Sequence, residues 1–266
     1  MDFQKVTAVA TRRGIFQPAF DAYGGLAGFY DYGPVGVRMR RRILEVWRKH
    51  YIIDAGCLEL DGALIGPETL FQASGHLGEF DDALVDCPDC GKQFRADHLV
   101  DGGDALTRED LAKAVSKTAC PNCGAELSEL KAFNLMFSTG VGSGRGAPGY
   151  LRPETAQSIF LAFPWLLRQN RGKLPFAGAQ IGRAFRNEIS PRQGPLRMRE
   201  FTQMEVEHFF LPGDEPGLSG SLKNVNITLV PAKGKKTTTT VGKAFSSGTL
   251  SSSLVAVHLA RAQSFL

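Results

Sequence analysis

The sequence predicts an α+β fold in which a mainly antiparallel sheet is flanked by helices. Three observations support this prediction. Residues 179–188 and 199–210 are strand candidates joined by a stretch with two prolines and a glycine, as in an antiparallel hairpin with a long tip. Apolar residues recur at helical spacing in 35–51, 155–170 and 249–266. Two Cys-X-X-Cys pairs indicate a small metal-binding insertion.

Length and composition are those of an ordinary globular protein. The 266 residues are 43% hydrophobic and 22% charged, which excludes a disordered tail, a coiled coil and a disulfide-dense miniprotein. We expect one large domain or a domain that carries an insertion. No run of about 18 uncharged apolar residues exists, and the N-terminus lacks the apolar core of a signal peptide. The expectation is a cytoplasmic protein without a membrane partner.

The positive charge is concentrated at one end. Residues 216–266 contain six Lys or Arg residues and no Asp or Glu, although the whole chain carries only +4. A polyanion partner is one explanation, and a solvated lysine loop around Thr237–Thr240 is at least as good. Charge alone therefore does not decide the function.

The first part of the chain predicts a turn, a helix and a strand. Glycines and tyrosines fill the turn Tyr23–Pro34, and Pro34 suits the start of a helix over 35–51. One face of this helix is rich in arginine. Alternation in Cys57–Ile65 predicts a strand, which Gly66-Pro67 is expected to end.

Four of the five cysteines form two knuckles, Cys87-Pro-Asp-Cys90-Gly and Cys120-Pro-Asn-Cys123-Gly. Four sulfurs on two tight turns match the tetrahedral preference of zinc, and a helix is expected over Arg108–Lys117 between them. Metal-free cysteine pairs are the alternative. A thioredoxin-like redox role fits less well, because no strand–CxxC–helix unit is evident. Cys57, alone in an apolar run, is expected to be buried.

The second half continues with the segment Phe133–Ser138 and a loop, Gly140–Gly149, that contains five glycines. No Gly-Lys-Ser/Thr follows the loop, so it is not a Walker-type phosphate loop. A further strand is expected over Asn224–Val230. The last helix has no Gly, Pro or polar cap behind it, which predicts that the sequence is the front part of a longer protein.

The predicted hairpin concentrates charge on one face. Alternate residues share a strand face, so Arg186 lies with Glu188, and the second strand contributes Arg199, Phe201, Gln203, Glu205 and Glu207. Charge on a sheet face is unfavourable unless it is solvated or paired, which favours a site for a polar ligand. A paired ion network on an exposed face is the alternative. Met204 and Val206, on the opposite face, are expected in the core.

The segment Phe185-Arg-Asn-Glu-Ile-Ser-Pro-Arg-Gln-Gly, followed by Arg197-Met-Arg-Glu-Phe201, resembles motif 2 of class II aminoacyl-tRNA synthetases. More narrowly, the chain is similar to glycyl-tRNA synthetases of the dimeric, archaeal and eukaryotic kind. The other matching segments follow in the family's order: Arg12-Arg-Gly, Tyr23-Gly-Gly, Tyr30-Asp-Tyr-Gly-Pro34, Ser74-Gly-His76, Phe94-Arg-Ala-Asp-His98, Phe133-Asn-Leu-Met-Phe137, Arg152-Pro-Glu-Thr-Ala-Gln157, Pro175-Phe-Ala177 and Ala179-Gln-Ile-Gly182.

The resemblance implies an ATP site. Arg186 would bind the α-phosphate, where adenylation builds negative charge that a fixed guanidinium stabilises. Glu188 would hold the adenine amino group or a magnesium ion, and both residues count as catalytic. Arg197 would reach the γ-phosphate and Phe201 would stack on adenine. The implied ATP site also includes Asn187 and Met198.

The resemblance also implies a glycine site. Glu154 and Glu205 match carboxylates that the family uses for the substrate ammonium, and a small anionic pocket excludes any Cβ. Gln203 and Arg95 are further expected members. Without the family match, Glu154 would be interpreted as a carboxylate at a helix N-terminus. Ser158 departs from the family's usual glycine beside this pocket.

The implied organisation is a class II catalytic sheet interrupted by the cysteine insertion. We expect residues 1–84 and 133–212 to form the catalytic domain, with motif 1 and motif 2 respectively. Residues 85–132 would be the zinc insertion, and 213–266 a truncated connector between motifs 2 and 3. Motif 1, over the helix and strand before Pro67, implies a homodimer, although its arginine-rich face also suits plain solvated surface. Motif 3, the third pocket carboxylate and the anticodon-binding domain are missing.

The leading hypothesis is an ATP-dependent glycine–tRNA ligase that uses Mg²⁺ with ATP, glycine and tRNA(Gly), and carries structural Zn²⁺. The chain as given would then lack motif 3. One alternative is a non-catalytic synthetase-like module that binds RNA or protein. Another is a zinc-ribbon nucleic-acid binder, which leaves the hairpin unexplained.

Overall fold

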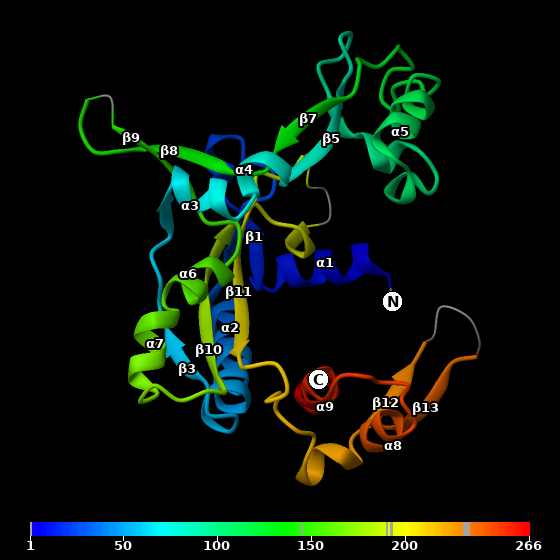
Figure 1. Cartoon of the computed structure of the whole chain (residues 1–266). Helices are drawn as coiled ribbons and strands as arrows, with labels where there is room; N and C mark the ends of the chain where they lie inside the picture. The colour runs from blue at the N-terminus through cyan, green and yellow to red at the C-terminus, as the bar shows by residue number, and fades with distance from the viewer. Residues whose placement is uncertain (1, 145, 190, 192–193, 231–234) are drawn as a thin grey trace. The chain divides into compact units, whose positions relative to one another are not determined.

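The computed structural model describes residues 2–144, 146–189, 191, 194–230 and 235–266. Within these ranges, short sheets and helices form an α+β fold (Figure 1). The chain divides into two compact units, which we describe separately. Unit 1 comprises Met1–Met39, Gly62–Gln157 and Gly182–Gln203, and unit 2 comprises Arg40–Asp61, Ser158–Ile181 and Met204–Leu266. Several positions in the segments discussed above lie outside the described residues: Arg145 in the glycine loop, Ser190, Arg192 and Gln193 in the motif 2 segment, and 231–234, with Lys233, in the basic end of the chain.

Unit 1 is built on small antiparallel sheets. Its helices are α1 (Phe3–Arg12), α3 (Glu68–Ala73), α4 (His76–Glu79) and α5 (Arg108–Val115). Its strands are β1 (Phe16–Pro18), β2 (Tyr30–Tyr32), β4 (Ile65–Pro67), β5 (Asp81–Asp86), β6 (Gln93–Arg95), β7 (Lys131–Asn134), β8 (Phe137–Val141) and β9 (Ala147–Leu151). They pair in the orders β1-β2, β4-β9-β8 and β6-β5-β7. Short 3-10 turns span Asp21–Tyr23, Ala96–Leu99, Gly103–Ala105 and Gly194–Leu196.

Unit 2 holds β3 (Leu58–Leu60), α7 (Phe163–Gln169), β12 (Asn226–Leu229), β13 (Thr237–Thr240), α8 (Val241–Ser246) and α9 (Ser253–Phe265). A π-helical turn covers Arg48–Ile53 and a 3-10 turn covers Gly220–Asn224. Four elements contribute residues to both units: α2 (Pro34–Trp47), α6 (Ala156–Leu161), β10 (Phe176–Phe185) and β11 (Glu200–Phe209). The sheet order is β11-β10-β3, and β3 runs parallel to β10, so the fold is not purely antiparallel.

Separate hydrophobic clusters stabilise different parts of the chain. In the cysteine insertion, Val85 and Phe94 pack with Leu111 and Val115 of α5. A second cluster joins α8 and α9 to the β12–β13 pair. A third contains the buried Cys57, with Met204 and Val206 packed against it, which confirms the predicted core face of the second hairpin strand.

Two predicted elements in the first two thirds of the chain are wrong in detail. The strand predicted over Cys57–Ile65 is two strands, β3 and β4, because the intervening carbonyl of Gly62 accepts a hydrogen bond from the Arg152 guanidinium rather than from a strand neighbour. The predicted loop Gly140–Gly149 is mostly hairpin. β8 and β9 pair from Phe137↔Leu151 to Val141↔Ala147, so both ends of the predicted loop belong to strands.

Two further predictions need correction. The helix over 155–170 is split into α6 and α7, because Pro164 lies in the first turn of α7 and has no amide hydrogen for a continuous helix. β10 ends at Phe185 and β11 begins at Glu200, so Arg186, Glu188 and Arg199 lie beyond the strands and not on their faces.

Other predictions are confirmed. The helix expected over 35–51 is α2, the one over Arg108–Lys117 is α5, and the strand over Asn224–Val230 is β12. The last helix begins at Ser253 because the Ser252 hydroxyl accepts a hydrogen bond from the Val255 amide. Across the described parts of the chain, none of the helices has the length and apolar character needed to cross a bilayer.

Candidate active site

Arg186 lies directly after β10 and is held from three sides. Its amide donates to the Arg199 carbonyl at 2.9 Å, and its Nε donates to the Pro153 carbonyl at 3.1 Å. Its Cζ lies 5.5 Å from the Phe80 ring centroid and 5.4 Å from that of Phe201, within cation–π range. Among the described residues no carboxylate forms an ion pair with Arg186. The guanidinium is therefore fixed in place, and its charge can act on an anionic ligand.

Glu188 is held through its backbone. Its carbonyl accepts hydrogen bonds from Nε and Nη2 of Arg199 at 3.1 and 2.8 Å, and the third nitrogen of that guanidinium donates to the Ala27 carbonyl at 2.9 Å. The side chain is only 11% exposed, and Arg197 Nε lies 3.8 Å from its Oε2. That oxygen accepts no hydrogen bond from the described residues. A buried carboxylate oxygen without a donor suits a cation or an amino group.

A glycine makes this arrangement possible. Gly28 has φ +80°, and a Cβ there would lie 2.6 Å from Cγ of Pro191. Its carbonyl accepts a hydrogen bond from the Arg199 amide at 2.8 Å. The turn expected over Tyr23–Pro34 thus packs directly against the segment that carries Glu188.

Glu154 belongs to a short chain of polar contacts. Its Oε1 accepts a hydrogen bond from Nε2 of Gln157 at 2.6 Å and lies 3.5 Å from Nε2 of His76. The opposite ring nitrogen, Nδ1, is 2.8 Å from the Ser74 hydroxyl. The segment before Glu154 is anchored by Arg152, which is 3% exposed and donates to the carbonyls of Arg183 and Gly62 at 2.8 and 2.9 Å.

Arg95 is paired with two carboxylates. It donates to Asp97 through Nε at 3.1 Å and Nη2 at 2.6 Å, and its Nη1 lies 3.1 Å from an Asp82 oxygen. Burial raises the pKa of Asp82 although the Arg95 charge acts against it. Burial would also raise the pKa of Asp97, but the hydrogen bonds and charge of Arg95, together with the charge of His98, lower that pKa overall.

The expected site residues are divided between the two units of the chain. All the expected ATP residues, together with Glu154, Gln203 and Arg95, belong to unit 1, whereas Glu205 belongs to unit 2. Met198 is buried, and the Asn187 amide donates to the Leu135 carbonyl at 2.8 Å. His76, Phe80, Asp82 and Asp97 were not predicted to have a role. His76 and Asp97 lie in matching segments, but no spacing rule connects Phe80 to Arg186 or Asp82 to Arg95.

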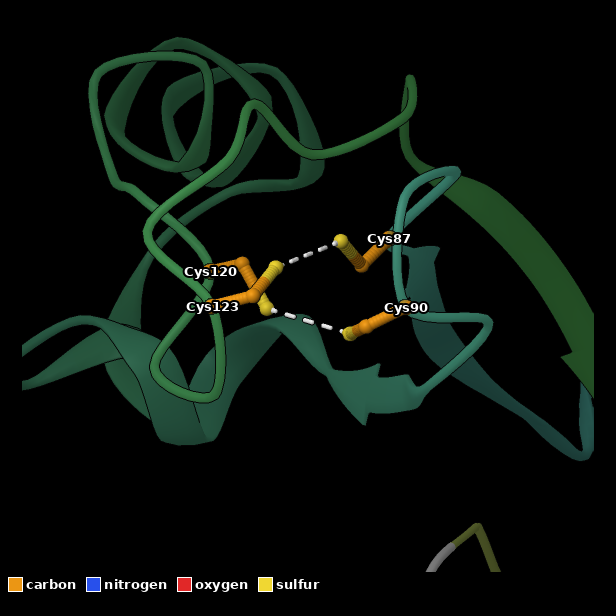
Figure 2. Close-up of side chains that lie close together, drawn as sticks. All are labelled: Cys87, Cys90, Cys120 and Cys123. Atoms are coloured by element: carbon orange, nitrogen blue, oxygen red, sulfur yellow. Dashed lines mark hydrogen bonds between the residues drawn. The ribbon is translucent and has the colours of Figure 1, made fainter.

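The four paired cysteines converge (Figure 2). Sγ of Cys87 lies 3.4 Å from Sγ of Cys123, Sγ of Cys90 lies 3.7 Å from Sγ of Cys120, and all four atoms are within 4.8 Å of one another. None of the four forms a disulfide. A tetrahedral ion with metal–sulfur bonds of about 2.3 Å separates its ligands by about 3.8 Å, so the sulfurs fit such an ion.

Backbone amides favour the thiolate form at Cys90 and Cys120, whereas at Cys123 the Ala125 amide is outweighed by the neighbouring sulfurs, which raise the pKa to about 12. The Lys92 amide is the main cause that lowers the pKa of Cys90 to about 6, and the Asn122 amide donates to Cys120 Sγ at 3.4 Å. A metal binds the thiolate form, so these amides support a possible four-cysteine metal site.

Comparisons with known proteins find a shared domain and several similar proteins. Residues 145–228 match the tRNA synthetase class II core domain (G, H, P, S and T). The chain is 45% identical to the glycine–tRNA ligase of Methanothrix thermoacetophila over 276 residues, covering 99% of this chain and 48% of that protein. It is 45% identical to the glycine–tRNA ligase of Methanocaldococcus jannaschii, covering 79% and 38%.

Among solved structures, the RNA binding domain of threonyl-tRNA synthetase from Cryptosporidium parvum aligns with 82% of this chain and 38% of its own, at 17% identity and a TM-score of 0.49. The chain spans about half the length of the curated relatives it matches, or less. Residues 145–228 thus carry a segment of the class II tRNA synthetase core domain, and the chain as a whole is similar to the glycine–tRNA ligases.

Proposed function

We propose that this chain belongs to a glycine–tRNA ligase and supplies the residues that hold ATP and glycine for adenylation. In that reaction a glycine carboxylate oxygen attacks the α-phosphorus of ATP, pyrophosphate leaves, and the glycyl group then passes to the terminal ribose of tRNA(Gly). The observation that carries the proposal is the Arg186 guanidinium, fixed by the Pro153 carbonyl and two rings without a carboxylate partner in the described residues.

On this proposal Arg186 binds the α-phosphate and stabilises the charge that develops there without having to reorganise. Phe201 stacks on adenine, and Arg197 contacts the γ-phosphate. Asn187 and Met198 line the same site. Oε2 of Glu188 accepts no hydrogen bond from the described residues, so it suits the adenine amino group or Mg²⁺. A bound Mg²⁺ would neutralise phosphate charge.

Glycine selection would rest on carboxylates. Glu154, oriented by Gln157 and His76, would receive the substrate ammonium together with Glu205 and Gln203. Arg95 is occupied by Asp82 and Asp97, so its part would be to orient these carboxylates beside the pocket. Carboxylates packed closely around the substrate ammonium would leave no room for a substrate Cβ.

The proposed organisation keeps the boundaries derived from the sequence. Residues 1–84 and 133–212 would form the catalytic domain, 85–132 a zinc insertion and 213–266 the connector toward motif 3. The insertion has its own cluster of buried residues, which supports treating it as a structural module. Zn²⁺ held by Cys87, Cys90, Cys120 and Cys123 would cross-link its two knuckles and add folding free energy.

The proposed assembly is a cytoplasmic homodimer. An exposed apolar stripe runs along α2 at helical spacing, with Val35, Met39 and Ile43 exposed by 49%, 52% and 50%. α2 lies in the segment that resembles motif 1. A second copy that covers this stripe would remove it from water.

Isothermal titration of ATP with Mg²⁺ into the 266-residue chain tests the ATP site. Arg186→Gln should weaken binding by about 10- to 100-fold, because a hydrogen-bonded charge contributes roughly 1.5–3 kcal/mol. Arg183→Gln is the matched control, since Arg183 pairs with Glu200 at 3.1 Å on an exposed surface. Equal ATP binding by the wild type and Arg186→Gln would refute the assignment. RNA binding that needs neither ATP nor Arg186 would favour the non-catalytic module.

A further inference from the structure

A cavity with both polar and apolar lining residues lies wholly within unit 2. Its volume is about 250 Å³. The titratable or cationic side chains that line it are Tyr51, Cys57, His208, His258 and Arg261. Its lining includes no Asp or Glu, and the nearby chain from residue 216 onward contains none. Positive or protonatable groups therefore face the cavity without a lining carboxylate to neutralise them.

The two imidazoles lie side by side. His208 in β11 and His258 in α9 have ring centroids 4.7 Å apart at an interplanar angle of 75°. Burial, followed by the charge of the neighbouring His258, lowers the pKa of His208 to about 4, and burial also lowers the pKa of His258. Both rings are thus held neutral beside a guanidinium, where a bound anion would allow them to become charged.

Arg261 is anchored through backbone groups. Its Nη1 donates to the His50 carbonyl at 3.4 Å, and its own carbonyl contacts His50 Nε2 at 2.9 Å. Among the described residues, no acidic side chain forms an ion pair with Arg261. Its charge contributes to the lowered pKa of both cavity histidines. Burial raises the pKa of Tyr51, and raises that of Cys57 to about 11, although the Arg261 charge opposes both shifts.

We propose that this cavity binds a small oxyanion, either a free ion or the phosphate of a small monoester, through Arg261, His208 and His258. The site belongs to unit 2 and does not depend on the proposed adenylation chemistry. The volume accommodates a phosphate with a small organic group, and Val206 and Val257 supply an apolar wall for such a group. Tyr51 and Cys57 are the remaining titratable groups facing the cavity, and both stay uncharged near neutral pH.

Proton linkage gives the proposal a distinct signature. An anion between the imidazoles raises their pKa, so binding takes up protons and strengthens as the pH falls. Sulfate is the suitable probe because its charge does not change between pH 5.5 and 8. For each proton taken up, sulfate affinity should rise about tenfold per pH unit until the bound histidines are saturated.

The test is calorimetric titration of sulfate into the chain at pH 5.5, 6.5 and 7.5 at constant ionic strength, with the histidine Cε1–H signals followed by NMR. We expect binding that strengthens at low pH and shifts the His208 and His258 resonances. Arg261→Gln should abolish it, Arg261→Lys should retain part of it, and Lys223→Gln, an exposed lysine of the same unit, should leave it unchanged.

Comparison of inorganic phosphate with ribose 5-phosphate separates a free-ion site from a monoester site. No sulfate binding, binding without the pH dependence, or equal binding by Arg261→Gln would each overturn the proposal. The readout is sulfate affinity and not ATP or glycine binding. A failure of the oxyanion proposal therefore leaves the adenylation proposal intact, and a failure of the adenylation proposal leaves the oxyanion proposal intact.

Discussion

Gly182 in β10 controls the position of the candidate active site. A Cβ at this residue would lie 2.1 Å from Nη2 of Arg152, well inside contact distance. Arg152 is 3% exposed and donates to the carbonyls of Arg183 and Gly62, so the guanidinium cannot simply swing into solvent. Gly182→Ala should therefore break hydrogen bonds from a charged donor.

The loss of one or two such hydrogen bonds is expected to lower the free energy of unfolding by about 2–4 kcal/mol, because each contributes roughly 1.5–3 kcal/mol. Relaxation of the neighbouring side chains recovers part of the lost free energy. ATP affinity should fall as well, since Arg152 directly precedes Pro153, whose carbonyl holds Arg186. Urea denaturation with Gly78→Ala as control checks this, because a Cβ at Gly78 meets nothing within 4 Å. A loss below 1 kcal/mol in Gly182→Ala would refute the packing argument.

Three further predictions concern separate parts of the chain. Cys90→Ser should abolish the binding of one zinc equivalent and lower the melting temperature, whereas the control Cys57→Ser should leave the zinc content unchanged. Metal analysis of both variants checks this prediction, and an equal zinc content in the two would contradict it. The free energy of unfolding should fall as the pH drops from about 6.5 toward 4, because both histidines become protonated in the unfolded chain while their lowered pKa values keep them neutral in the folded chain. His208 accounts for at most about 3 kcal/mol of this loss. Denaturation midpoints that do not move over this pH range would contradict the prediction. On the proposed function, His76→Ala should raise the KM for glycine about tenfold and leave ATP binding unchanged, because one contact to the Glu154 carboxylate is lost. A change confined to ATP binding would contradict this prediction.

Features encoded over short stretches could be predicted from the sequence. The cysteine knuckles are such a case, because each Cys-X-X-Cys turn positions two sulfurs locally and only the approach of the two turns needs tertiary structure. α5 and β12 were predicted for the same reason. α1 was not predicted, although Asp2 supplies its N-cap by accepting hydrogen bonds from the amides of Gln4 and Lys5.

Contacts between distant segments could not be predicted. Phe80 reaches Arg186 and His76 reaches Glu154 only because the chain folds back on itself, and no periodicity connects these pairs. The ends of β10 and β11 were also misplaced. Alternation alone extends both strands through Arg186 and Arg199, whereas the Asn187 amide pairs instead with the Leu135 carbonyl and takes the chain out of the ladder.

Glycine-dependent exchange of pyrophosphate into ATP, measured on the protein that contains this chain, tests the central claim most directly. The account predicts exchange with glycine and none with alanine, and its loss in Arg186→Ala while Arg183→Ala retains it. Exchange that is undiminished in Arg186→Ala, or that alanine supports as well as glycine, would contradict the account.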